Sequence, residues 1–157
     1  MSKNEHPEEF LTVVPTANMP GIRQNGLNEG TYFVSSHFPD YGKLLDYYAE
    51  EVKGDDPAGY VILSVQGKFL SDENMEPDRP GIAEPITGAI GKTNAEVIDS
   101  WLRVDGEGTG RDTLNIIGSM QYSKRIPVEH ITIESGQEPK PLVDYNPPKP
   151  SQSFTHT

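Results

Sequence analysis

A histidine and a threonine two positions apart are the residues of this chain best suited to acid–base chemistry. His130 and Thr132 alternate with Ile131 and Ile133 in the run HITI. Because side chains alternate across an extended strand, the histidine and the hydroxyl would share one face and the two isoleucines the other. Acid–base catalysis in which one group acts as the base and another as the acid needs a second proton-transfer group. The best candidate for that group is His37.

The run of residues 130–133 resembles one of the two motifs of the two-histidine phosphoesterases, whose paired histidines and hydroxyls hold and protonate a phosphodiester. The resemblance implies a small phosphoesterase or nucleotide-binding domain that uses His130, Thr132 and His37. The second motif of that family is incomplete here, because Pro39 stands where the hydroxyl after His37 is required. A phosphate-ester site is therefore an alternative hypothesis and not the leading one.

Two glycine-rich segments have features of nucleotide-binding loops. Residues 88–93 (GAIGKT) precede an expected helix, but Ile86 occupies the position of the first glycine of a phosphate-binding loop. Residues 106–110 (GEGTG) lie between an expected helix and an expected strand, whereas a dinucleotide fingerprint runs from strand to helix. We expect a turn into a capped helix at the first segment and a connecting loop at the second.

The residues that usually bind metals are few and badly spaced. The chain has 4 histidines and no cysteine, and no pair of histidines has the spacing of a zinc site. The acidic run 72–78 (DENMEPD) offers oxygen ligands, but it lacks the glycine and the spacing of an EF-hand. We expect neither a metal nor another cofactor, and no Ser-His-Asp arrangement can be assigned.

The chain is acidic, with a formal net charge of −11. This charge makes the electrostatic term repulsive for nucleic acids and for anionic membrane surfaces. A small acidic inhibitor or immunity-type protein with a basic partner is a further alternative. No apolar run approaches the roughly 18 residues of a membrane-spanning helix, and the N-terminal MSKNEHPEEF lacks the order of charges of a signal peptide. We expect a cytoplasmic protein, or one carried in a virion assembled there.

The middle of the chain, residues 31–134, has the patterns of one globular α+β domain. Segments rich in β-branched and aromatic residues predict strands over residues 31–36, 60–66, 112–122 and 128–134. Apolar residues at three- and four-residue spacing predict two helices, over residues 40–53 and 93–103. Asp40 is the expected N-cap of the first helix and Gly54 its stop. The second helix opens with the capping box of Thr93 and Glu96.

These elements predict a mixed or antiparallel sheet of four or five strands with two helices on one face. The nearly continuous apolar run 60–66 belongs in the centre of the sheet. Residues 71–92 are expected to be a long acidic loop, of the kind that contacts another chain or carries function. Gly118 is expected to be a bulge in the strand 112–122, which should pair antiparallel with the strand 128–134.

Both ends of the chain, residues 1–30 and 135–157, are rich in proline and glycine or polar residues and are expected to be extended arms. In the N-terminal arm, Phe10 and Val14 share one face of a short extended segment that must add to this protein's own sheet or to a neighbour's. The proline-rich C-terminal arm carries three apolar anchors for a partner, Val143, Tyr145 and Phe154.

The arms, the long loop, the acidic surface and the lack of a complete catalytic set favour a non-enzymatic assembly protein. Such a protein would pack with copies of itself, as a homo-oligomer, or onto a larger protein lattice. A small bacteriophage virion component, such as a decoration, neck or tail protein, fits this architecture best. Architecture alone does not fix function.

Overall fold

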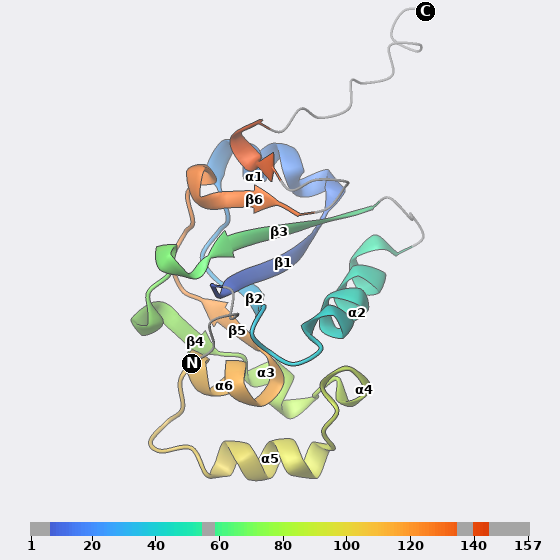
Figure 1. Ribbon diagram of the computed structural model, residues 1–157, viewed down its shortest axis with the longest axis vertical. Helices are drawn as coiled ribbons and strands as arrows, with labels where there is room; N and C mark the ends of the chain where they lie inside the picture. The colour runs from blue at the N-terminus through green and yellow to red at the C-terminus, as the bar shows by residue number, and fades with distance from the viewer. Residues whose placement is uncertain (1–6, 55–58, 135–139, 145–157) are drawn as a thin grey trace, which may run out of the picture.

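An antiparallel open sheet forms the centre of this α+β fold (Figure 1). The computed structural model describes residues 7–54, 59–134 and 140–144. The sheet order is β4-β5-β2-β1-β3-β6-β7. The strands are β1 (Glu9–Pro15), β2 (Thr31–Ser35), β3 (Tyr60–Gln66), β4 (Met75–Pro77), β5 (Ser119–Tyr122), β6 (Ile131–Ile133) and the two-residue edge strand β7 (Lys140–Pro141). The described helices are α1 (Met19–Asn25), α2 (Tyr41–Lys53), α3 (Arg79–Ala83), α4 (Thr87–Ile90), α5 (Asn94–Leu102) and α6 (Gly110–Ile117). In this part of the chain, none of the helices has the length and apolar character needed to cross a bilayer.

Strand β1 lies in the middle of the sheet although it comes first in the chain. It pairs with β2 on one side and along its whole length with β3 on the other. Its residues 10–14 are nearly all apolar, which fits a strand whose two faces are both covered. Phe10 and Val14 join the larger core, whereas Leu11 packs into the core beneath α2. The expected addition of this segment to the protein's own sheet is therefore confirmed, whereas an arm that leaves the domain is wrong for the described residues of 1–30.

The same segment continues into helix α1, despite its proline and glycines. Pro20 lies in the first turn of α1, where the N–H that proline lacks has no helical partner in any case. Met19 is fully buried in the larger core. Turn residues in this segment therefore mark the ends of elements and not an arm that leaves the domain.

Helix α2 covers one face of the sheet (Figure 1) and confirms the helix expected over residues 40–53. Leu44, Leu45 and Ala49 are its buried residues, as an amphipathic helix requires. The helix ends at Gly54, as expected. Asp40 occupies the N-cap position with φ 57°, but its side chain makes no capping hydrogen bond, so the expected role of its carboxylate is wrong.

Helices α3, α5 and α6 gather at one end of the molecule (Figure 1) and share a smaller core of Ile82, Val97, Ile116 and Ile117. The capping box of Thr93 and Glu96 is present at the start of α5, which confirms the second expected helix.

The strand expected over residues 112–122 is wrong in its first half. Residues 110–117 form helix α6, which opens with a capping box of Thr109 and Asp112. Gly118 is not a bulge: it ends α6 with φ 85°, and only then does β5 begin. Strand β5 pairs with β2 and β4, and β6 pairs with β3 and β7, so the two last expected strands are not partners.

The long loop expected over residues 71–92 contains regular structure. It holds the edge strand β4 and the short helices α3 and α4. Asp78 caps α3 and Pro80 lies in the first turn of that helix, so the proline begins a helix here instead of preventing one. The domain therefore has more strands and more helices than the sequence predicts.

Candidate ligand cavity

The partner-binding residues expected from the sequence are scattered. Phe10 and Val14 are buried in the protein's own core and offer no surface to a partner. Val143 is 49% exposed and follows the fully buried Leu142 in the segment 140–144. Tyr145 and Phe154 lie outside the described residues.

The two histidines of the phosphate-ester hypothesis are not brought together. His130 lies in a 3-10 turn before β6, and its ring stacks on Phe69 with the centroids 4.0 Å apart. The register runs from Ser35 through β1 and β3 to Ile131, which is three strand spacings or roughly 14 Å. His37 follows Ser35 by two residues and His130 directly precedes Ile131, so the two histidines come from segments at opposite ends of that row. Thr132 alternates with two buried isoleucines, as expected.

Lys92, in the glycine-rich segment before α5, makes its contacts within the protein. The Nζ of Lys92 donates a hydrogen bond of 2.6 Å to the backbone oxygen of Ile116 and lies over the ring of Phe38. Residues 88–90 belong to α4, which was not expected, and only Gly91 and Lys92 form the expected turn into the capped helix α5. Among the described residues, no group of histidines and carboxylates is arranged to hold a metal ion.

A polar cluster of Glu8, Arg111, Asp72 and Ser35 ties the start of β1 to α6. The guanidinium of Arg111 contacts both carboxylate oxygens of Glu8 at 2.9 Å. Ser35 donates a hydrogen bond of 2.5 Å to the same carboxylate, and Asp72 accepts one from Arg111. Burial alone would raise the pKa of Glu8, but the hydrogen bonds from Arg111 and Ser35 outweigh it and lower this pKa. The cluster is internally satisfied and acts as a structural tie.

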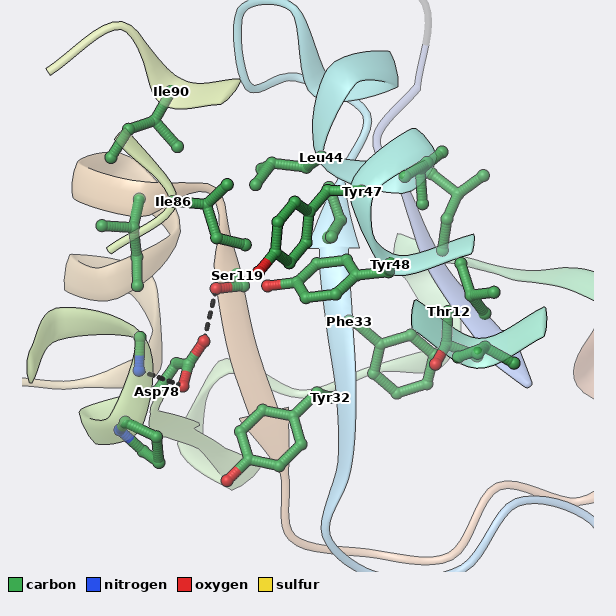
Figure 2. Close-up of a pocket in the computed structure, with 18 of the residues that line it drawn as sticks. Thr12, Tyr32, Phe33, Leu44, Tyr47, Tyr48, Asp78, Ile86, Ile90 and Ser119 are labelled. Carbon is green, nitrogen blue, oxygen red and sulfur yellow. Dashed lines mark hydrogen bonds between the residues drawn. The ribbon is translucent and has the colours of Figure 1, made fainter. Parts of the chain in front are cut away.

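The feature best suited to binding is a cavity of about 400 Å3 between α2, the sheet and the α3–α4 segment (Figure 2). Its walls are mainly aliphatic and aromatic, and are formed by Leu11, Val13, Phe33, Val34, Leu44, Leu45, Ile86, Ile90 and Ile117, among others. Tyr32 and Tyr47 also line it, and each is 43% exposed. Large rings that are half exposed beside an apolar cavity provide a surface on which a ligand can pack.

The polar end of the cavity is formed by Asp78 and Ser119, which are 4% and 2% exposed. The hydroxyl of Ser119 donates a hydrogen bond of 2.6 Å to Oδ2 of Asp78, and the backbone N–H of Gly81 donates one of 2.9 Å to Oδ1 (Figure 2). The backbone N–H of Asp78 donates to Oγ1 of the buried Thr113 in α6. Asp78 is thus fixed by three separate elements.

The charge of this buried carboxylate contributes to raised pKa values of two tyrosines. The hydroxyl of Tyr48 points toward Ser119 (Figure 2). Burial, together with the charge of Asp78, raises the pKa of Tyr48 to about 12. Burial and the same charge also raise the pKa of Tyr32. Both phenols therefore stay protonated at neutral pH, and the hydroxyl of Tyr48 can serve as a hydrogen-bond donor or acceptor at the polar end of the cavity.

The sequence contains only a partial signal for this cavity. Asp78 followed by Arg-Pro-Gly has the form of a helix N-cap with proline in the first turn, and an N-cap is where a carboxylate can be buried with backbone donors. Ser119 carries no local signal, because it meets Asp78 only through the pairing of β4 with β5. Tyr48 follows the helical period of α2, but the period does not show that a cavity lies beneath it.

No protein-family model matches the chain, and neither a curated protein nor a solved structure matches it significantly. Function is therefore inferred from the geometry of the cavity and from the sequence.

Proposed function

We propose that this protein binds a small, largely apolar molecule in the cavity beneath α2. The observation that carries this proposal is the combination of an apolar cavity of about 400 Å3 with one polar end built from Asp78, Ser119 and Tyr48. Cavities of this size and composition are typical of sites for small ligands, in which a few convergent polar groups fix the orientation of the molecule.

The test is a fragment titration with a variant that fills the cavity. Fluorinated one- and two-ring aromatic compounds are titrated against the full chain by fluorine NMR. Ile86→Trp places a larger side chain on the cavity wall, and we expect it to weaken binding at least tenfold. Ile98→Trp is the matched control, because Ile98 is 48% exposed on α5 and does not line the cavity. Equal binding by Ile86→Trp and the parent chain would contradict the proposal.

We also propose that the segment after residue 144 mediates assembly, with copies of this chain or with a larger protein lattice. One observation supports this: Leu142 is fully buried beside the edge strand β7, so the proline-rich sequence that follows starts from a fixed point. A small bacteriophage virion component, cytoplasmic until it is packaged, remains the setting that fits best. Because β1 lies in the middle of the sheet, the N-terminal segment does not support this proposal.

The assembly proposal is tested by the solution mass of the full chain beside a chain ending at Asp144. This end point keeps Leu142 in the core, whereas a chain ending at Glu134 would also lose that anchor. We expect an oligomer that dissociates in the shorter chain, measured by light scattering after size exclusion. Two monomers of unchanged fold would contradict self-association through this segment.

A further inference from the structure

We infer that the ligand of this cavity carries a protonated amine, which binds the carboxylate of Asp78. The inference rests on the proposed ligand-binding function and adds the chemical class of the ligand to it. It is argued from the charge of the cavity lining and from the hydrogen-bonding capacity of one buried side chain.

Asp78 is a buried carboxylate without a cationic partner among the described residues. The ion pairs of this part of the chain join Lys53 to Glu50, Arg103 to Asp99, and Arg111 to both Glu8 and Asp72. The cationic neighbour of Asp78 in sequence, Arg79, lies over the ring of Trp101 at 5.8 Å. Buried charges in proteins are usually paired, because desolvation of an isolated charge is costly. A cationic ligand would supply the missing partner.

The carboxylate also retains capacity to accept hydrogen bonds. Oδ1 accepts one hydrogen bond, from Gly81, and Oδ2 accepts one, from Ser119. A carboxylate has about four lone-pair sites, so roughly two remain for a ligand. An ammonium group offers three donors and forms charge-assisted hydrogen bonds with such an acceptor.

The remainder of the lining suits a cation and disfavours an anion. The described residues that line the cavity include no lysine, arginine or histidine. Its second acid, Glu84, is exposed and adds negative charge to that of Asp78. The rings of Tyr32, Tyr47 and Tyr48 offer faces that attract a cation. The net charge of −11 further favours the approach of a cationic ligand.

Three indole probes of similar size separate the effect of ligand charge from that of apolar contact. Tryptamine is a cation, tryptophol is its neutral alcohol counterpart, and indole-3-acetate is an anion. Dissociation constants are measured at pH 7 from the amide shifts of the 15N-labelled full chain. The amide of Gly81 reports on the site directly, because it donates to Asp78. We expect tryptamine to bind at least about tenfold more tightly than tryptophol, and indole-3-acetate to bind most weakly.

The variant Asp78→Asn tests the role of the charge itself. Its amide oxygen can still accept from Gly81, so the cap of α3 is preserved in form. We expect this variant to lose at least about tenfold in tryptamine affinity, while tryptophol affinity changes less than threefold. If the variant fails to fold, the comparison of the three probes on the parent chain decides the matter alone.

The outcomes separate the two proposals. Equal affinities for tryptamine and tryptophol, both weakened by Ile86→Trp, would overturn the inference of a cationic ligand and leave the ligand cavity standing; Asp78 would then be a structural cap only. Binding of none of the three probes at millimolar concentration would contradict both. Preference for tryptamine that persists in Asp78→Asn would also overturn the assignment of the carboxylate.

Discussion

The hydroxyl of Ser119 donates a hydrogen bond of 2.6 Å to the carboxylate of Asp78, although the two residues lie 41 positions apart. The bond joins the first residue of β5 to the cap of α3 and closes the polar end of the cavity. Because both groups are buried, the same contact contributes to stability and sets the chemistry that a ligand meets. Substitutions of Ser119 or Asp78 should therefore be tested for their effects on both stability and ligand binding.

Replacement of Ser119 by alanine should destabilise the fold. The substitution removes one of the two donors to a buried carboxylate, and a buried group that loses its partner costs about 1–3 kcal/mol. Urea unfolding of the two chains measures the difference. Ser71→Ala is the control, because Ser71 is exposed and its side chain makes no capping hydrogen bond. Equal stability of Ser119→Ala and the parent chain would show that Asp78 does not depend on this donor.

The polar tie at Glu8 predicts a dependence of stability on pH. The pKa of Glu8 in the folded protein lies below 4.5, the ordinary value of a glutamate, because burial, which would raise it, is outweighed by the hydrogen bonds from Arg111 and Ser35. A lowered folded-state pKa contributes stability that is present above the unfolded-state pKa and is lost as the pH falls through the folded-state pKa. Glu8→Gln should therefore be less stable than the parent chain at pH 7, and the gap should close as the pH is lowered below about 4.5.

The measurement is the free energy of unfolding of both chains from pH 7 to pH 3. Asp99→Asn serves as the control, because the ion pair of Asp99 with Arg103 is exposed on both sides and such pairs contribute little. A gap between Glu8→Gln and the parent chain that stays constant across this range would rule out the titration of Glu8 as its origin.

Local signals in the sequence were sufficient where one residue and its near neighbours decide the structure. The capping box of Thr93 and Glu96 predicted the start of α5, and the apolar period of residues 41–53 predicted α2. Thr109 and Asp112 provide the same kind of signal, but the β-branched Ile116 and the glycine after α6 favour a strand over residues 112–122. Helix propensity is weak enough for capping and packing to override it.

The features that the sequence does not predict depend on pairing between segments that are far apart in the chain. The segment of β1 carries the apolar run of a strand, yet nothing local shows that β2 and β3 pair on either side of it. The cavity is harder still to predict, since Asp78 and Ser119 approach only after the sheet has formed. Pro20 and Pro80 favour an arm and a loop in the sequence, yet they lie in the first turns of α1 and α3, where proline is tolerated.

Leu142 should be essential to the attachment of the C-terminal segment. Its side chain is fully buried in the larger core, so Leu142→Ala should cost about 2–5 kcal/mol of unfolding free energy. Val143→Ala is the matched control: Val143 is 49% exposed, and its truncation should cost less than about 0.5 kcal/mol. Equal effects of the two substitutions would show that the segment does not pack on the core as described.

Gly118 should tolerate no side chain, for two separable reasons. Its φ of +85° is a conformation that costs an alanine about 1–2 kcal/mol, and an added Cβ would lie 2.6 Å from Cδ2 of Phe38. Gly91 also ends a helix in the left-handed conformation, with φ +72°, but an added Cβ there would have no heavy atom within 4 Å. Gly91→Ala therefore measures the conformational cost alone.

We expect Gly118→Ala to be more destabilising than Gly91→Ala by a further 1–3 kcal/mol or so, because the core beneath α2 must shift to admit the methyl group. Thermal and urea unfolding of both variants give the comparison, and equal losses would mean that Phe38 moves aside at no cost.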